Sequence, residues 1–198
     1  MDVASAPEEL GRLIDLMVDI NLYAIERFAK AGADAFMWFD DWGLQHHLMV
    51  APESWREIWK PRYAKVYKAV HDAGLFTFLH SCGDITSILD DLIEIGLDVI
   101  QMDQQENMGL ERLGREFGGR ITFWSPVDIQ ATMVNGSLDD IRAYCNKMVT
   151  TLGRPNGGFM ASWYTDPTGA GHRQEALDAM CQEFVKISNE FGTMGVQR

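Results

Sequence analysis

The segment LFTFLHSCGD, residues 75–84, decides how this chain folds. Its first half is a short apolar run, and its second half, His80-Ser81-Cys82-Gly83-Asp84, places an imidazole and a thiol two residues apart. A helical stripe follows directly, formed by Ile85, Ile88, Leu89, Leu92 and Ile93. This order predicts a strand, a turn and a helix. In parallel α/β proteins the carboxyl ends of strands meet the amino ends of helices at one edge, where ligands bind, so we expect the chemical centre there.

Short apolar runs alternate with helical stripes along the whole chain, which is typical of βαβ units and indicates an α/β fold. We predict parallel strands at residues 35–39, 75–79, 98–102, 121–124 and 158–162. About five such units are too few for a closed eight-stranded barrel, so the sheet is expected to stay open.

Four longer helices are predicted between and around these strands. They cover about residues 7–30, 52–72, 138–152 and 173–191, and the third is preceded by a capping box formed by Ser137 and Asp140. Pro61 is expected to kink or break the second helix. The first helix carries an apolar side of Leu10, Leu13, Ile14, Met17, Ala24, Ile25 and Phe28, and Cys145 and Cys181 fall on apolar helix faces, where core packing is expected.

Length and composition exclude several classes of protein. A chain of 198 residues with 46% hydrophobic content suits one globular domain. The net charge of -12 repels nucleic acid and anionic membranes, and no apolar stretch approaches the ~18 residues of a membrane span. With no secretion signal and an odd number of cysteines, we expect a cytoplasmic protein with free thiols.

Polar residues follow every predicted strand. Asp40 and Asp41 follow the first, and each is either a general acid, base or substrate anchor, or a turn and capping residue. Neighbouring side chains on an extended backbone point opposite ways, so only one carboxylate is expected to face the centre. For the adjacent His46 and His47 we favour a solvent or interface role. The further polar residues at strand ends include Gln45, Asp103, Asp128, Tyr164 and Asp166.

His80 and Cys82 allow two interpretations. Imidazole and thiolate are the usual ligands of zinc, and a helix amino terminus favours a thiolate for metal binding or nucleophilic attack. The alternative is a hydrogen-bonded buried histidine beside a small apolar cysteine. Two ligands alone do not decide between them.

Several motifs occur in an order that resembles the uroporphyrinogen decarboxylase superfamily. They are AGADA at 31–35, DDWG at 40–43, APE at 51–53, HSCG at 80–83, GLDVI at 96–100 and GGF at 157–159. The resemblance runs from about residue 5 to residue 191 and matches only the carboxyl-terminal portion of the family's fold. It implies a partial TIM-type (β/α)8 barrel of about five βα units, as one domain over residues 1–198 that lacks the amino-terminal strands.

Within that superfamily the His-x-Cys pair resembles the cobalamin-dependent methyltransferase branch. The resemblance implies zinc held by His80 and Cys82, and it implies that a substrate thiolate attacks a methyl group carried by a corrinoid protein. Relatives place a third ligand, a cysteine, after the last strand, where this chain offers Asp166 and, further on, His172. Asp40, Asp41 and Gln45 are then expected to shape the catalytic pocket. Substrate contacts are expected from Tyr164, Asp103 and Asp128.

Two alternatives from other classes remain. The chain is a non-catalytic truncated or split-barrel subunit, completed by a complementary barrel subunit or by self-association, or it is a uroporphyrinogen decarboxylase-type lyase completed in trans. We therefore expect a corrinoid protein or a complementary subunit as partner, in a homo- or hetero-oligomer, with zinc as cofactor and cobalamin supplied by the partner.

Overall fold

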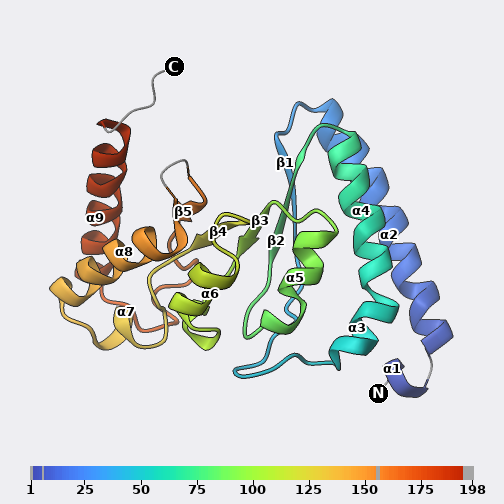
Figure 1. Ribbon diagram of the computed structural model, residues 1–198, viewed down its shortest axis with the longest axis horizontal. Helices are drawn as coiled ribbons and strands as arrows, with labels where there is room; N and C mark the ends of the chain where they lie inside the picture. The colour runs from blue at the N-terminus through green and yellow to red at the C-terminus, as the bar shows by residue number, and fades with distance from the viewer. Residues whose placement is uncertain (1, 6, 155–156, 194–198) are drawn as a thin grey trace. The chain divides into compact units, whose positions relative to one another are not determined.

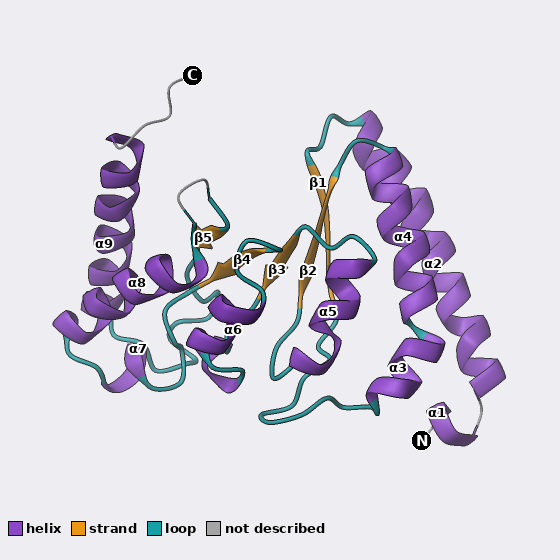
Figure 2. Ribbon diagram, in the orientation of Figure 1, coloured by secondary structure: helices purple, strands orange, loops and turns teal. Residues whose placement is uncertain are grey.

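The computed structural model describes residues 2–5, 7–154 and 157–193. Helices and strands alternate as the sequence predicts (Figures 1 and 2), and the chain divides into two compact units, Met1–Ile100 and Gln101–Arg198. The prediction of a single domain over residues 1–198 stays a prediction. Among the described residues no helix combines the length and the apolar character needed to cross a membrane.

All five predicted strands are present in one sheet, whose strand order is that of the chain. The sheet of described strands is not closed, which confirms the α/β fold and the partial barrel. The first strand has the predicted bounds, and each of the others differs from its predicted range by one residue at each end. The strands are β1 (Ala35–Phe39), β2 (Phe76–His80), β3 (Val99–Gln101), β4 (Thr122–Ser125) and β5 (Phe159–Ala161).

The helices of the first unit are α1 (Asp2–Ser5), α2 (Pro7–Lys30), α3 (Pro52–Ile58), α4 (Lys60–Asp72) and α5 (Thr86–Glu94). The break predicted from Pro61 is confirmed, because α3 ends at Ile58 and α4 restarts at Lys60. Proline has no N–H for the helical ladder and its ring clashes with the preceding turn, so it fits only in the first turn of α4.

The core of the first unit is rich in aromatic side chains. Trp55 and Tyr67 are fully buried. Rings from α3, from α4, from β1 and from the loop that follows β1 contact one another in a single cluster. The members of this aromatic cluster are Trp38, Trp42, Trp55, Trp59, Tyr63 and Tyr67. β2 and α5 complete the core with Leu79, Ile85, Ile88, Leu89 and Leu92.

The apolar side of α2 does not pack as one surface. Ile25 is buried, whereas Leu13, Met17 and Phe28 are 51–56% exposed. Figure 1 shows α2 alongside α4, and ion pairs from Asp15 to Arg62 and from Asp19 to Lys65 join the two helices. The residues that face α4 are therefore only part of the predicted stripe.

The second unit contains η1 (Gln105–Asn107), α6 (Leu110–Glu116), α7 (Thr132–Asn135), α8 (Leu138–Leu152) and α9 (Gln174–Thr193). Its core gathers Phe123 of β4, Leu113 of α6 and the inner faces of α8 and α9. Cys145 is buried as expected, but Cys181 is exposed, so the core prediction is wrong for Cys181. All three cysteines are free thiols.

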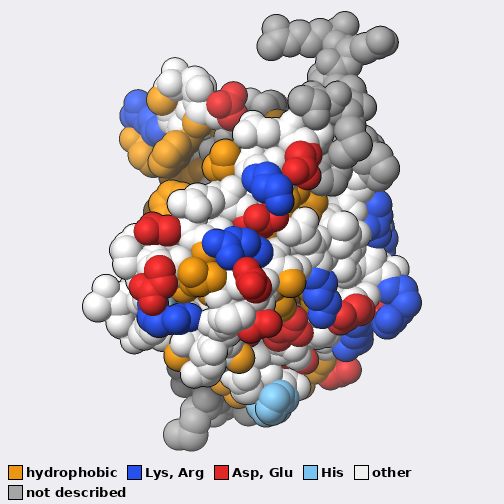
Figure 3. Space-filling view, turned by 90° about the vertical axis from the view of Figure 1, so that its left-hand side faces the viewer, with side chains coloured by type: hydrophobic (Ala, Val, Ile, Leu, Met, Phe, Trp, Pro, Cys, Tyr) orange, Lys and Arg blue, Asp and Glu red, His pale blue; other side chains and the backbone are white. Residues whose placement is uncertain are grey.

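Acidic and basic side chains are interspersed on the molecular face shown in Figure 3. The ion pairs Arg142–Asp139 and Lys186–Glu183 of α8 and α9 have the same character. Mixed charges of this kind give no basic patch on that face for a polyanion.

The capping box at the start of α8 is confirmed and gives the first testable prediction. The Ser137 Oγ accepts from the Asp140 N–H at 3.2 Å, and the Asp140 carboxylate accepts from the Ser137 N–H at 2.9 Å. We predict that Ser137→Ala lowers the free energy of unfolding, measured in urea, by about 1 kcal/mol. Ser137→Asn keeps an oxygen acceptor and should retain most of that stability. Equal losses in both variants would contradict the capping role.

Candidate metal centre

The parallel pairing of β1 with β2 builds the centre. Its register places Phe39 opposite His80, so the residues that follow both strands emerge side by side. The pairing extends past β1, because the Asp40 N–H donates to the His80 carbonyl at 3.0 Å. Asp41 is thereby brought beside the segment that carries His80 and Cys82.

The two loops then cross at a pair of glycines. The Gly43 N–H donates to the Cys82 carbonyl at 3.1 Å, and the Asp84 N–H donates to the Leu44 carbonyl at 2.8 Å. A Cβ on Gly43 would lie 2.4 Å from the Gly83 carbonyl carbon, and one on Gly83 would lie 2.3 Å from the Gly43 carbonyl carbon. Gly83 also has φ +73°, which favours glycine. Only glycines allow the two backbones to approach so closely.

Three potential metal ligands meet at this crossing. One ligand atom from each of Asp41, His80 and Cys82 lies within 4.8 Å of the others. The His80 Nε2 is 3.2 Å from the Asp41 Oδ1 and 3.4 Å from the Cys82 Sγ. Ligand atoms about 2.0–2.3 Å from a tetrahedral zinc ion lie roughly 3.3–3.7 Å apart; the Nε2–Sγ separation falls in that range, and the Nε2–Oδ1 separation is slightly shorter.

The same contacts hold the ligands in place without a metal. The Cys82 N–H donates to the Asp41 Oδ1 at 2.8 Å, and the Trp42 N–H donates to the Ser81 Oγ at 3.0 Å. The His80 side chain is only 13% exposed, whereas that of Asp41 is 53% exposed. A largely covered imidazole, a thiol and an exposed carboxylate form a donor set that fits zinc, with one side open to solvent.

The two adjacent aspartates have different surroundings. The Asp40 carboxylate accepts a hydrogen bond from the Tyr63 hydroxyl, which itself accepts from the Trp42 indole N–H at 2.9 Å. Burial raises the pKa of Asp40, and the charge of Asp41 adds to that increase, while the bond from Tyr63 opposes it. Burial and the Asp40 charge raise the pKa of Tyr63 as well, so its hydroxyl stays protonated and donates. Asp40 therefore faces the aromatic cluster, and Asp41 faces the ligands.

Comparison with known protein families identifies the chain. The model of the family described as uroporphyrinogen decarboxylase (URO-D) matches residues 1–163. The chain belongs to the uroporphyrinogen decarboxylase family. None of the curated proteins matches it significantly in sequence.

Solved structures show which fold this family member shares. A methyltransferase from Methanosarcina mazei superposes with a TM-score of 0.70 at 18% identity, covering 94% of this chain and 52% of that one. The citrate synthase SbnG gives a TM-score of 0.48 at 14% identity, over 86% of this chain and 70% of that one. The first likeness supports the barrel-type fold, and this chain spans about half the length of that methyltransferase.

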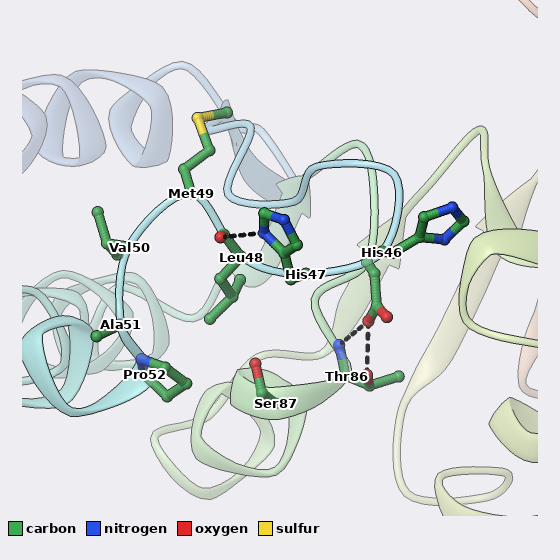
Figure 4. Close-up of a pocket in the computed structure, with 10 residues that line it drawn as sticks. His46, His47, Leu48, Met49, Val50, Ala51, Pro52, Thr86 and Ser87 are labelled. Atoms are coloured by element: carbon green, nitrogen blue, oxygen red, sulfur yellow. Dashed lines mark hydrogen bonds between the residues drawn. The ribbon is translucent and has the colours of Figure 1, made fainter.

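The loop after β1 also carries Gln45, His46 and His47, all of them exposed. His46 and His47 line a surface pocket with residues 48–52 and the start of α5 (Figure 4). The His47 Nδ1 lies 2.9 Å from the Leu48 carbonyl, and neither histidine belongs to the group of potential ligands. The expected catalytic role of Gln45 stays a prediction.

The other predicted site residues belong to the second unit. Asp103 is buried and accepts from the Gln101 side-chain amide at 2.8 Å. Asp128 is buried and accepts from the backbone N–H groups of residues 130, 131 and 132, in the turn that leads into α7. The Tyr164 ring lies 6.0 Å from the His172 ring, and the exposed Asp166 carboxylate accepts from the Gly169 N–H at 2.9 Å. Their predicted roles in substrate and metal binding stay predictions.

The sequence did not indicate Tyr63 as a site residue. Its position on the same face of α4 as Val66, Tyr67 and Val70 predicts a core side chain, which is correct for its ring. Only the tertiary structure shows that its hydroxyl reaches Asp40. The one signal in the sequence was a polar hydroxyl on an otherwise apolar face of the helix, which needs a hydrogen-bond partner when buried.

The glycine crossing gives a matched test. Gly83 and Gly74 have similar φ angles, +73° and +76°, but only Gly83 is in close contact with another backbone. Gly74→Ala should lower the free energy of unfolding by roughly 1–2 kcal/mol, the cost of an alanine in the left-handed conformation. Gly83→Ala should lower it clearly more, because the two loops must also separate. Urea unfolding of both variants measures the difference. Equal losses would show that the crossing is not tightly packed.

Proposed function

We propose that this member of the uroporphyrinogen decarboxylase family is a methyltransferase-type enzyme with zinc bound by Asp41, His80 and Cys82. The observation that supports it is the convergence of these three ligand atoms within 4.8 Å. The sequence suggested Asp166 as the third ligand, and in this proposal Asp41 fills that position instead. Asp41 lies in the same unit as His80 and Cys82, and its carboxylate already lies at ligand distance from His80.

Zinc supplies one kind of chemistry at such a centre: it stabilises a substrate thiolate at neutral pH as a nucleophile for a methyl group. The chain's own residues orient that reaction. The Cys82 N–H fixes the Asp41 carboxylate, and the strand register holds the His80 ring beside it. The exposed side of Asp41 leaves an approach for the substrate.

Asp40 and Gln45 have separate roles in this proposal. Asp40 is held by Tyr63 and Trp42, and it positions the loop that carries Asp41, so we assign it as a positioning residue. Gln45 lies four residues after Asp41 in the exposed loop, and we propose that it contacts the substrate. Asp103, Asp128 and Tyr164 remain proposed substrate contacts from the second unit.

We propose a corrinoid protein as the methyl-group partner, with cobalamin carried by that protein. The likeness to a methyltransferase fold and the thiol-compatible metal ligands both support this partner. Free cysteines support a reducing compartment such as the cytoplasm. A porphyrinogen substrate is less well supported, because its several carboxylates need cationic partners and the chain carries a net charge of -12.

Zinc binding tests the centre itself. We predict about one zinc ion per purified chain, measured by elemental analysis after removal of loosely bound metal. Asp41→Asn, His80→Ala and Cys82→Ala should each weaken binding by more than the roughly 10–100-fold that loss of an outer-shell partner costs. Asp166→Asn should bind like the unmodified chain, since the proposed centre takes its third ligand from Asp41.

Two controls make this result specific. Asp178→Asn removes an exposed carboxylate from α9 and should leave zinc binding unchanged. Substitution with cobalt(II) should give a thiolate absorption band that Cys82→Ser removes. If the unmodified chain and Cys82→Ala bind the same small amount of zinc, the proposed centre is wrong; a loss in Asp166→Asn would restore Asp166 as a ligand.

Methyl transfer is tested separately. We predict that the zinc-loaded chain accelerates methyl transfer from free methylcobalamin to a small thiol such as dithiothreitol, followed by the absorbance change of the corrinoid. Cys82→Ala should fall to the rate measured without protein, and Asp178→Asn should retain the full rate. If the chain binds zinc through the three ligands but transfers no methyl group, the proposed metal centre stands and the proposed methyltransferase reaction is wrong.

A further inference from the structure

Helix α2 has two opposite faces. The residues Gly11, Val18 and Ile25 recur every seven positions, are buried and lie on the side that packs on α4. The opposite side carries a second row of apolar residues. This exposed α2 stripe consists of Leu13 (56% exposed), Leu16 (58%), Met17 (55%), Ile20 (59%) and Tyr23 (60%).

The spacing of the stripe is that of a helix–helix contact. Counted from Leu13, its members lie at positions i, i+3, i+4, i+7 and i+10, which aligns them along one side of the helix. Single exposed apolar residues are ordinary on a protein surface, but a continuous row of five is typical of an interaction surface. Within the described residues, nothing covers it.

Four of the five stripe residues and the flanking charges are placed symmetrically about position 18; Met17 is not, because its counterpart position holds Asp19. Leu16 and Ile20 lie two residues on either side of that position, and Leu13 and Tyr23 lie five residues on either side. Glu9 and Arg27 lie nine residues on either side, in the first and last turns of α2. An antiparallel copy of the same helix would therefore set Leu16 against Ile20, Leu13 against Tyr23 and Glu9 against Arg27.

We propose that the exposed α2 stripe is the interface through which two copies of this chain form a dimer. The helices pack antiparallel around a two-fold axis near position 18, with the apolar row at the centre. An ion pair between Glu9 of one copy and Arg27 of the other forms at each end, twice by symmetry. This arrangement buries apolar surface at the centre and leaves the charges at the rim, as in protein interfaces generally.

In forming the dimer, Glu9 and Arg27 would exchange their partners within the chain for each other across the interface. In the single chain Glu9 pairs with Arg12 at 3.0 Å, and the Arg27 guanidinium donates to the Tyr23 hydroxyl at 2.7 Å. The Glu9 and Arg12 side chains are 64% and 74% exposed, so their pair contributes little and can be exchanged at low cost. The apolar row then supplies most of the affinity, and the ion pairs fix the antiparallel direction.

Sedimentation equilibrium over a concentration series tests the dimer. The unmodified chain, of 22.4 kDa, should approach the mass of two chains. Leu16→Glu combined with Ile20→Glu should keep the mass of one chain throughout, because four carboxylates would face one another in the interface. Val185→Glu places the same change at a 61% exposed apolar residue of α9 and should still dimerise. Circular dichroism of each variant shows that the fold is retained.

A charge exchange tests the direction of packing. Glu9→Lys alone should weaken dimerisation at low salt by placing two cations together, and adding Arg27→Glu should restore it. A single-chain mass at every concentration would overturn the proposal. So would a dimer that the Leu16 and Ile20 changes leave intact, or a stripe that is covered by a different chain in a mixed complex.

Discussion

The hydrogen-bonded pairing of β1 with β2 is the constraint on which the candidate centre depends. It sets Phe39 opposite His80, and a shift by one residue would turn the His80 side chain to the other face of the sheet. The pairing continues into the crossing of Gly43 and Gly83, where the absence of a Cβ on both residues lets the backbones meet. Asp41 reaches His80 and Cys82 only because both conditions are met.

The centre is built within one unit of the chain. Its three potential ligands lie at the end of β2 and in the loops that follow β1 and β2, all within Met1–Ile100. The chain spans about half the length of the methyltransferase with which it shares a fold. Metal binding in the proposed form needs no residue outside that unit, whereas substrate and partner contacts from the second unit are a separate matter.

Adjacent aspartates can serve different purposes because an extended backbone points them apart. Asp40 lies in the aromatic cluster, where burial raises its pKa and the Tyr63 hydroxyl bonds to it. Asp41 lies more than half exposed beside His80, within reach of a metal. Neighbouring positions of α2 also face different surroundings: one face packs on α4, and the opposite face is apolar and exposed.

The sequence by itself determined the order and type of the elements, since their signals are local. The apolar run before His80 predicts β2, Pro61 predicts the break between α3 and α4, and Ser137 with Asp140 predicts the start of α8. The sequence also located His80 and Cys82 at a strand end. The tertiary structure alone decided that Asp41 lies beside them, that Tyr63 binds Asp40, and which apolar residues of α2 are buried. Those relations join residues far apart in the chain or choose between faces of equal periodicity, and only the register of paired strands and the packing of neighbouring helices fix them.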